Sequence, residues 1–188
     1  MVYYRLSSQG DLPSYPLETK GLSKPESTHC WTDGYSASFI IPLLHEGQLI
    51  KQIIFQDSFA LISQECSQII NVKLNNVFIG SYLYNILNPK HTIIVTIPND
   101  FSEDTAIISF EIPNACPVSI YDSRILGVAF NVIELVTDNE IKQQEDAIRH
   151  YQMQQANERN QQMEQQLSNT LNEVMTRNLR MFQTTRLW

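Results

Sequence analysis

The chain has 188 residues, enough for one well-buried domain with an appendage and too few for two full-sized domains. Its 20 acidic and 13 basic residues give a formal net charge of -7. An acidic balance disfavours general binding to nucleic acid or to an anionic membrane surface. We therefore expect basic partners or neutral ligands, with no nucleic acid and no membrane insertion.

The N-terminal sequence lacks the basic stretch and apolar run of a secretory signal, and its apolar runs are shorter than a membrane span. We therefore expect a cytoplasmic protein. Cys30, Cys66 and Cys116 are far apart and odd in number, so the sequence predicts neither a disulfide framework nor a metal knuckle. We expect reduced thiols that pack as small hydrophobic side chains.

Residues 1–34 contain three prolines together with Gly10 and Gly21. These residues interrupt regular structure, which predicts an extended, loop-like lead-in that lies over the core.

Residues 35–136 predict a series of strands. The segments are rich in Ile, Val, Phe, Thr and Tyr, which fit a pleated, half-buried surface, and turn residues separate them. Seven or eight short strands without an intervening helix indicate a mainly β fold, an antiparallel β-sandwich of the jelly-roll kind. The predicted strands cover residues 35–44, 49–55, 59–63, 68–74, 77–84, 91–97, 105–112 and 128–136.

Asn75 and Asn76 join two of these strands, and paired asparagines tolerate the positive φ angles of a tight hairpin turn. The final strand alternates its side chains between two faces, and Gly127 at its start indicates a bulge or a close approach by a neighbour. Thr137 and Glu140 then have the spacing of a capping box, which marks the start of a helix.

The C-terminal part, residues 137–188, predicts a long polar helix that forms an arm. Its apolar residues form two groups, and residues 152–162 between them are mostly Gln, Asn, Glu and Arg. The pattern fits one continuous helix that is solvated in the middle, or two helices with a break near residues 157–160.

No common catalytic motif occurs in the sequence: there is no Gly-x-Ser-x-Gly, P-loop, Gly-x-Gly-x-x-Gly or His-Glu-x-x-His. The four histidines lie in separate segments, and no pair of carboxylates stands out as an acid and base. We expect a protein that is not an enzyme and has no metal and no cofactor.

Three regions carry residues that resemble a known family. They are Trp31–Gly34, Val72–Asn76 with Ile79 and Gly80, and Asp122–Ala129. Over residues 30–136 the chain resembles the jelly-roll accessory module of some bacterial glycosyltransferases and related polysaccharide proteins. The resemblance implies a β-sandwich similar to carbohydrate-binding modules. The chain departs from the family in having no attached transferase, in Asn76 where the family often has Gly, and in its C-terminal helix.

Four residues are candidates for ligand binding. Asp122 and Arg124 precede a predicted strand whose other side chains we expect to be largely buried. Arg124 either braces the loop by pairing with Asp122 or contacts a ligand. Trp31 and Tyr35 are among the aromatic residues that could offer a face to a sugar, although we expect most of these aromatics in the core.

The C-terminal tip is the second candidate site, since it is basic and aromatic on an acidic protein. It either folds back onto its own sandwich or binds a partner, because Trp and Arg are favoured anchors at interfaces. Our leading hypothesis is a bacterial protein-protein interaction or adaptor module, as in a secretion or surface-polysaccharide assembly, that uses the helix to bind another protein or a second copy. The alternative is a carbohydrate-binding module. The predicted partner-binding residues are Leu171, Val174, Arg177, Arg180, Phe182 and Trp188.

Overall fold

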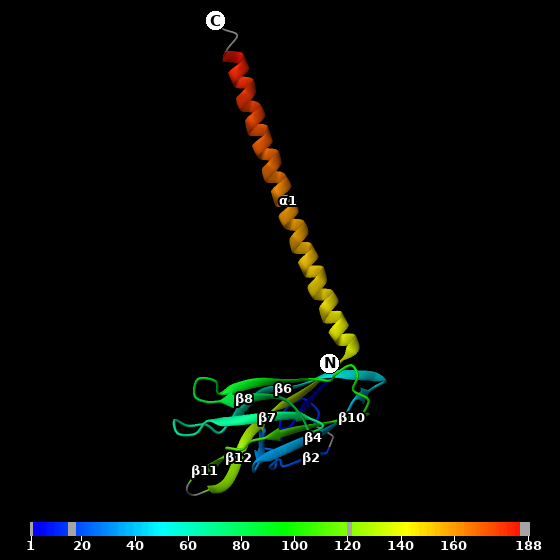
Figure 1. The fold of residues 1–188 in the computed structure, drawn as a ribbon, viewed down its shortest axis with the longest axis vertical. Helices are drawn as coiled ribbons and strands as arrows, with labels where there is room; N and C mark the ends of the chain where they lie inside the picture. The colour runs from blue at the N-terminus through cyan, green and yellow to red at the C-terminus, as the bar shows by residue number, and fades with distance from the viewer. Residues whose placement is uncertain (1, 15–17, 120–121, 185–188) are drawn as a thin grey trace. The chain divides into compact units, whose positions relative to one another are not determined.

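The structure, a computed structural model, describes residues 2–14, 18–119 and 122–184 (Figure 1). Side chains are described as far as Thr176, with gaps at residues 116 and 118–122. The chain divides into two compact units, Met1–Ile141 and Lys142–Trp188. The first is a β-sandwich and the second belongs to the helix α1 (Asp138–Thr184), so the mainly β class with a helical arm is confirmed.

The larger sheet is built around one long strand, β6 (Gln48–Ala60). Ile53 of β6 pairs with Val95 on one edge and with Leu135 on the other, so β6 lies in the interior of the sheet. All its pairings are antiparallel. The other strands of this sheet are β1 (Val2–Arg5), β3 (Cys30–Asp33), β5 (Leu44–His45), β9 (Lys90–Thr96), β11 (Cys116–Ser119), β12 (Asp122–Phe130) and β13 (Val132–Thr137).

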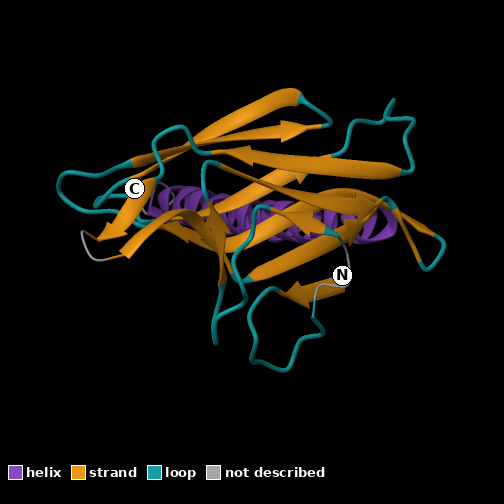
Figure 2. Ribbon diagram, turned by 90° about the horizontal axis from the view of Figure 1, so that it is seen from below, coloured by secondary structure: helices purple, strands orange, loops and turns teal. Residues whose placement is uncertain are grey.

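The smaller sheet packs against the larger one as a second layer (Figure 2). Its strands, in spatial order, are β2 (Thr19–Lys20), β4 (Ser36–Pro42), β10 (Thr105–Glu111), β7 (Gln68–Leu74) and β8 (Val77–Tyr84). The chain moves back and forth between the sheets, so that β3-β12-β6-β9 faces β4-β10-β7-β8. This is the strand order of a jelly roll, in which two Greek keys form a double sheet.

The centre of the sandwich is a cluster of four phenylalanines. Phe39 and Phe110 come from the smaller sheet and Phe55 and Phe130 from the larger one, and all four are fully buried. All six pairs of their ring centroids are 4.8–5.8 Å apart, mostly with the edge of one ring against the face of another. Rings in this geometry attract each other beyond the gain from burial.

A buried hydrogen-bond network also joins the two sheets. The Tyr84 hydroxyl of β8 lies 2.7 Å from Ser58 Oγ of β6, and Ser58 Oγ donates to the His91 carbonyl at 2.6 Å. Tyr84 is therefore the donor to Ser58. Burial of the phenol raises the pKa of Tyr84, which keeps the hydroxyl protonated and able to donate.

Several strand predictions are confirmed, and others differ in detail. The predicted final strand, residues 128–136, is divided at Asn131 between β12 and β13. The predicted strands 49–55 and 59–63 are one strand, because the polar residues between them form a bulge around Asp57, which has a φ of 48°. The lead-in contributes three strands, β1 to β3, since short extended segments can pair at a sheet edge despite nearby prolines. The four-residue strand β11 was not predicted.

The turn and cap predictions are confirmed. Asn75 and Asn76 have φ values of 45° and 67° between β7 and β8. The Glu140 carboxylate accepts the Thr137 backbone N–H at 2.9 Å and caps the start of α1. The helix continues through residues 157–160, so the alternative of two helices is wrong.

The prediction of three reduced thiols is wrong for Cys66, which is disulfide-bonded. Cys30 is a free, buried thiol that donates to the Ser23 carbonyl at 3.1 Å. Burial raises the pKa of Cys30, which makes it a poor nucleophile.

Gly127 allows the close approach that the sequence predicted. A Cβ at this position would lie 2.4 Å from Ile112 Cδ1 and 2.5 Å from Thr32 Oγ1. The same Thr32 Oγ1, fully buried in β3, accepts the backbone N–H groups of Gly127 and Val128 at 3.1 and 3.0 Å. A side chain at residue 127 would push apart the strands that these hydrogen bonds join.

Gly127→Ala should lower the free energy of unfolding by about 1–3 kcal/mol, the usual cost of overpacking a core. Urea denaturation of the full chain measures this change. Gly80→Ala is the matched control, since Gly80 is also a strand glycine and a Cβ there would meet nothing within 4 Å. Equal losses in the two variants would contradict the packing account of Gly127.

Candidate functional site

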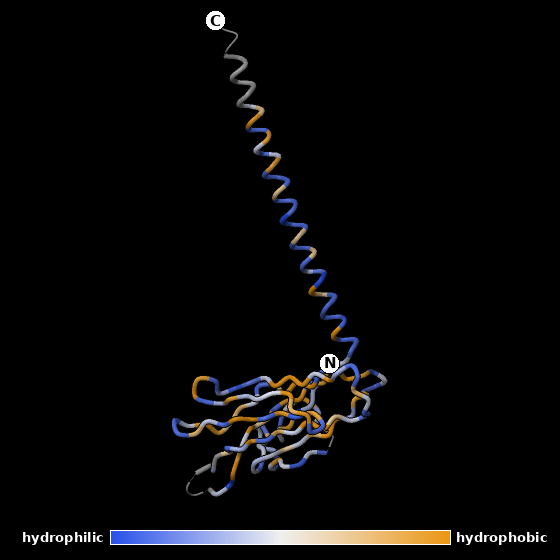
Figure 3. Tube along the Cα trace, in the orientation of Figure 1, coloured by the Kyte–Doolittle hydropathy of each residue, from blue (hydrophilic) through white to orange (hydrophobic). Residues whose placement is uncertain are grey.

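The surface of α1 is the most extensive candidate for binding. Every side chain from Lys142 to Thr176 is exposed. Most of these residues are hydrophilic, with apolar residues scattered among them (Figure 3). A helix that is polar over most of its surface usually needs many internal ion pairs or a packing partner to be stable.

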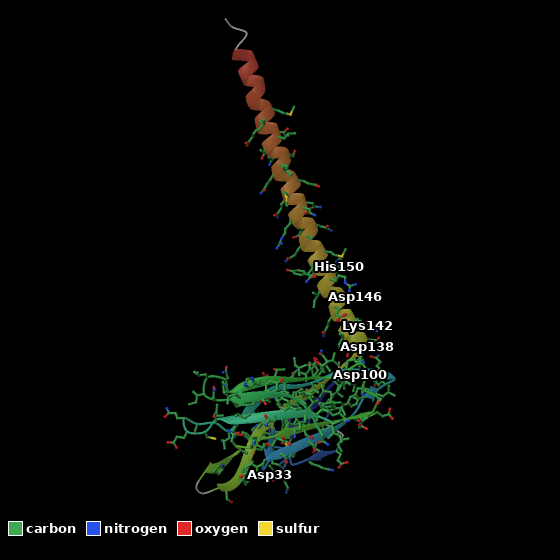
Figure 4. The ribbon with its side chains drawn as sticks, viewed as in Figure 1. Asp33, Asp100, Asp138, Lys142, Asp146 and His150 are labelled. Carbon is green, nitrogen blue, oxygen red and sulfur yellow. The ribbon has the colours of Figure 1, made fainter. Side chains whose placement is uncertain are left out.

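Side-chain contacts along the exposed part of α1 include kinds that contribute little to stability. Asp146 and Arg149 form an exposed ion pair at 3.7 Å, a kind of contact that contributes little to stability. Gln155 donates to the Tyr151 hydroxyl at 2.7 Å. Polar, titratable residues follow one another along the first turns, as Asp138, Lys142, Asp146 and His150 show in Figure 4. Packing against a partner would supply stability that these local contacts do not.

The exposed apolar residues of α1 include a stripe along one face. At about 100° per residue, Ile141, Ile148, Met163 and Val174 fall within an arc of roughly 80°. Ile148, Met163 and Val174 are 58%, 56% and 52% exposed, and Ile141 is half-buried. We call these four residues the apolar stripe. These four residues give α1 one apolar face that can pack along a partner helix. The other exposed apolar residues described in α1 lie outside this arc: Tyr151, Met153, Leu167, Leu171 and Met175.

The predicted partner-binding residues are described in part. Leu171 and Val174 are 64% and 52% exposed and available for contact. Arg177, Arg180 and Phe182 lie within α1, but their side chains are outside the described residues, as is all of Trp188. The idea that the tip folds back onto the sandwich therefore stays a prediction.

The predicted ligand-binding residues are not shown to form one site. The Trp31 ring packs edge-to-face on Phe59 at 5.3 Å and is half-buried, outside the hydrophobic core cluster. Tyr35 is 55% exposed beside β4. The Arg124 side chain is exposed, and that of Asp122 is outside the described residues, so the brace between them stays a prediction.

A polar groove crosses the outer face of the smaller sheet. It has a volume of about 340 Å³. The register places Ser109 beside both Ser38 and Lys73, and Glu111 beside Ser36, so three neighbouring strands contribute to it. Lys73 Nζ lies 2.5 Å from Glu111 Oε1 and forms a partly exposed ion pair. The polar residues that line the groove include Lys20, Ser36, Ser38, Lys73, Ser109 and Glu111.

Sequence reasoning missed this groove. Its residues occupy alternate positions of strands whose other positions are buried, such as Lys73 between Val72 and Leu74. That alternation showed which side chains face outward, but not which strands are neighbours. The adjacency of β4, β10 and β7 depends on the long-range strand order.

A buried carboxylate in the larger sheet has a structural role. Glu134 accepts hydrogen bonds from Gln56 Nε2 at 2.5 Å and from the Tyr3 hydroxyl at 3.2 Å. Partial burial and the neighbouring carboxylate raise the pKa of Tyr3. Both oxygens of Glu134 have donors, so the network joins β1, β6 and β13 and leaves no oxygen obviously directed at a substrate.

No protein-family model matches the chain, and no curated protein matches it. Among solved structures, an acetyl xylan esterase (Est2A) from the rumen bacterium Butyrivibrio proteoclasticus is similar, with a TM-score of 0.44 and 9% sequence identity. The similarity covers 72% of this chain and 32% of the esterase, so this chain spans about a third of that protein's length. Within the described residues, no helix has the length and apolar character that crossing a membrane requires.

Proposed function

We propose that this chain is a non-enzymatic protein-protein interaction module, in which the sandwich is a stable base and α1 binds a partner helix. The observation that supports this most strongly is the apolar stripe on a helix whose described side chains from Lys142 onward are all exposed. Two helices can cover their apolar stripes by packing these stripes against each other.

The energetics favour such pairing. Fully burying one side chain of the size of Ile or Val contributes about 1.5–3 kcal/mol. The four residues of the apolar stripe would therefore offset much of the entropy lost on association. The Gln and Asn residues beside the stripe remain solvated or form hydrogen bonds at the rim, as interface rims usually do.

The resemblance to jelly-roll accessory modules supports a bacterial setting in secretion or surface-polysaccharide assembly. A cytoplasmic location is not part of the proposal, because disulfides such as that of Cys66 persist mainly in oxidising compartments.

A photo-crosslinking residue at position 148 or 174 of the full chain, expressed in its native cells, tests the proposal. The yield of crosslinked protein should be at least tenfold higher with these probes than with probes at His150 or Asn172. Those control residues lie on the opposite face of the same helix and are also exposed. Equal yields on the two faces would refute the proposal.

A carbohydrate-binding role is a second candidate, and the polar groove supports it. Serine hydroxyls, a lysine and a carboxylate can donate to and accept from the hydroxyl groups of a sugar. The volume of about 340 Å³ lies within the usual range for small-ligand sites. Tyr35 precedes Ser36 and is exposed, so an aromatic face is available beside the groove.

A glycan array probed with the full chain tests this role. We expect Lys73→Ala to reduce the binding of a recognised glycan at least tenfold, because Lys73 lines the groove. Lys90→Ala, an exposed lysine on the other sheet, should leave binding unchanged. Absence of binding by the unmodified chain, or equal loss in both variants, would exclude the groove as a sugar site.

A further inference from the structure

We infer that the partner helix is α1 of a second copy of this chain, packed antiparallel and paired along its full length. This inference rests on the proposed function, and it adds the identity of the partner and the orientation of the two helices. It follows from how apolar and charged residues are distributed between Asp138 and Thr184.

Reversing one copy places two pairs of apolar residues opposite each other. Ile148 lies ten residues after the first residue of α1, and Val174 lies ten residues before the last. When two copies of α1 run antiparallel and overlap along their whole length, these two residues therefore lie opposite each other. Ile141 and Met181 are likewise each three residues from an end. Two-fold symmetry repeats each contact, which is how a self-complementary surface forms a closed dimer.

The charges of α1 favour this orientation over a parallel one. Its first nine residues include four acids, of which Glu145 is one, and a single base, Lys142. Arg177 and Arg180 lie near its other end, and no acid follows Glu173 in the chain. Antiparallel pairing brings the acidic end of each copy beside the basic end of the other and places Glu145 opposite Arg177. A parallel pair in register would instead place acid beside acid, which is unfavourable.

The middle of the helix is compatible with the same register. Gln152 comes opposite Thr170, and Arg159 opposite Met163. Gln152, Arg159 and Thr170 are polar residues on the same face as the stripe, and Met163 belongs to the stripe itself. A polar contact within an apolar seam costs stability but fixes the register of paired helices. The antiparallel arrangement also aligns the two helix dipoles favourably.

Disulfide crosslinking of the full chain tests the arrangement. Ile148→Cys and Val174→Cys are prepared as separate variants, mixed and oxidised. The mixed pair should form at least tenfold more crosslinked dimer than either variant alone. In the antiparallel dimer the two copies of residue 148 are about 39 Å apart, too far for a disulfide. The native Cys30 is buried, so the unmodified chain gives the background.

The matched control is His150→Cys mixed with Asn172→Cys. These residues are equally symmetric about the centre of α1 but lie on its opposite face, so they should give only background crosslinking. Efficient crosslinking of Ile148→Cys with itself would show a parallel pair and overturn the inference. Preferential crosslinking of Ile148→Cys to Leu167→Cys would show a shifted register and overturn it as well.

A chain that is monomeric by sedimentation and gives only background crosslinking also overturns the inference. The proposed function would still stand in that case if photo-crosslinks from positions 148 and 174 reach another protein in cells. Loss of those photo-crosslinks would remove the proposed function itself, so the two failures are distinguishable.

Discussion

The mutual contact of Phe39, Phe55, Phe110 and Phe130 holds the two sheets of the sandwich together. Each ring comes from a different strand, and the cluster joins β4 and β10 to β6 and β12. Removing one such ring typically costs about 3–5 kcal/mol, a large share of the stability of a domain of this size. The jelly-roll strand order brings these four positions together and fixes the faces that remain outside.

Two outer features follow from this packing. The buried positions of β4, β10 and β7 face the core, so the intervening serines, Lys73 and Glu111 gather in the groove on the opposite face. The last strand, β13, pairs with β6 through Thr137, whose backbone N–H is held by Glu140. The same short segment therefore ends the sheet and starts α1. Segment 122–136 precedes α1 in the chain. Near its start the Gly127 backbone N–H donates to Thr32, and its last residue is followed by the cap of α1.

The sequence was sufficient to predict features that depend on local chemistry. Enrichment in β-branched and aromatic residues identified β7 and β8, paired asparagines identified their turn, and Thr137 with Glu140 identified the start of α1. Features that depend on distant residues were missed. The pairing of β3 with β12, the groove around Lys73 and the disulfide of Cys66 all require knowledge of which segments meet in space. The bulge at Asp57 resembled a turn because a polar triplet can interrupt a strand without ending it.

The central claim is that pairing stabilises α1, whose side chains from Lys142 to Thr176 are all exposed. Amide hydrogen exchange over residues 142–176, measured on the full chain at a series of concentrations, tests this claim most directly. The account predicts strong protection at high concentration that falls at least tenfold on dilution, while protection of β6 and β10 stays constant. Protection of residues 142–176 that does not change with concentration, or that is absent throughout, would contradict it.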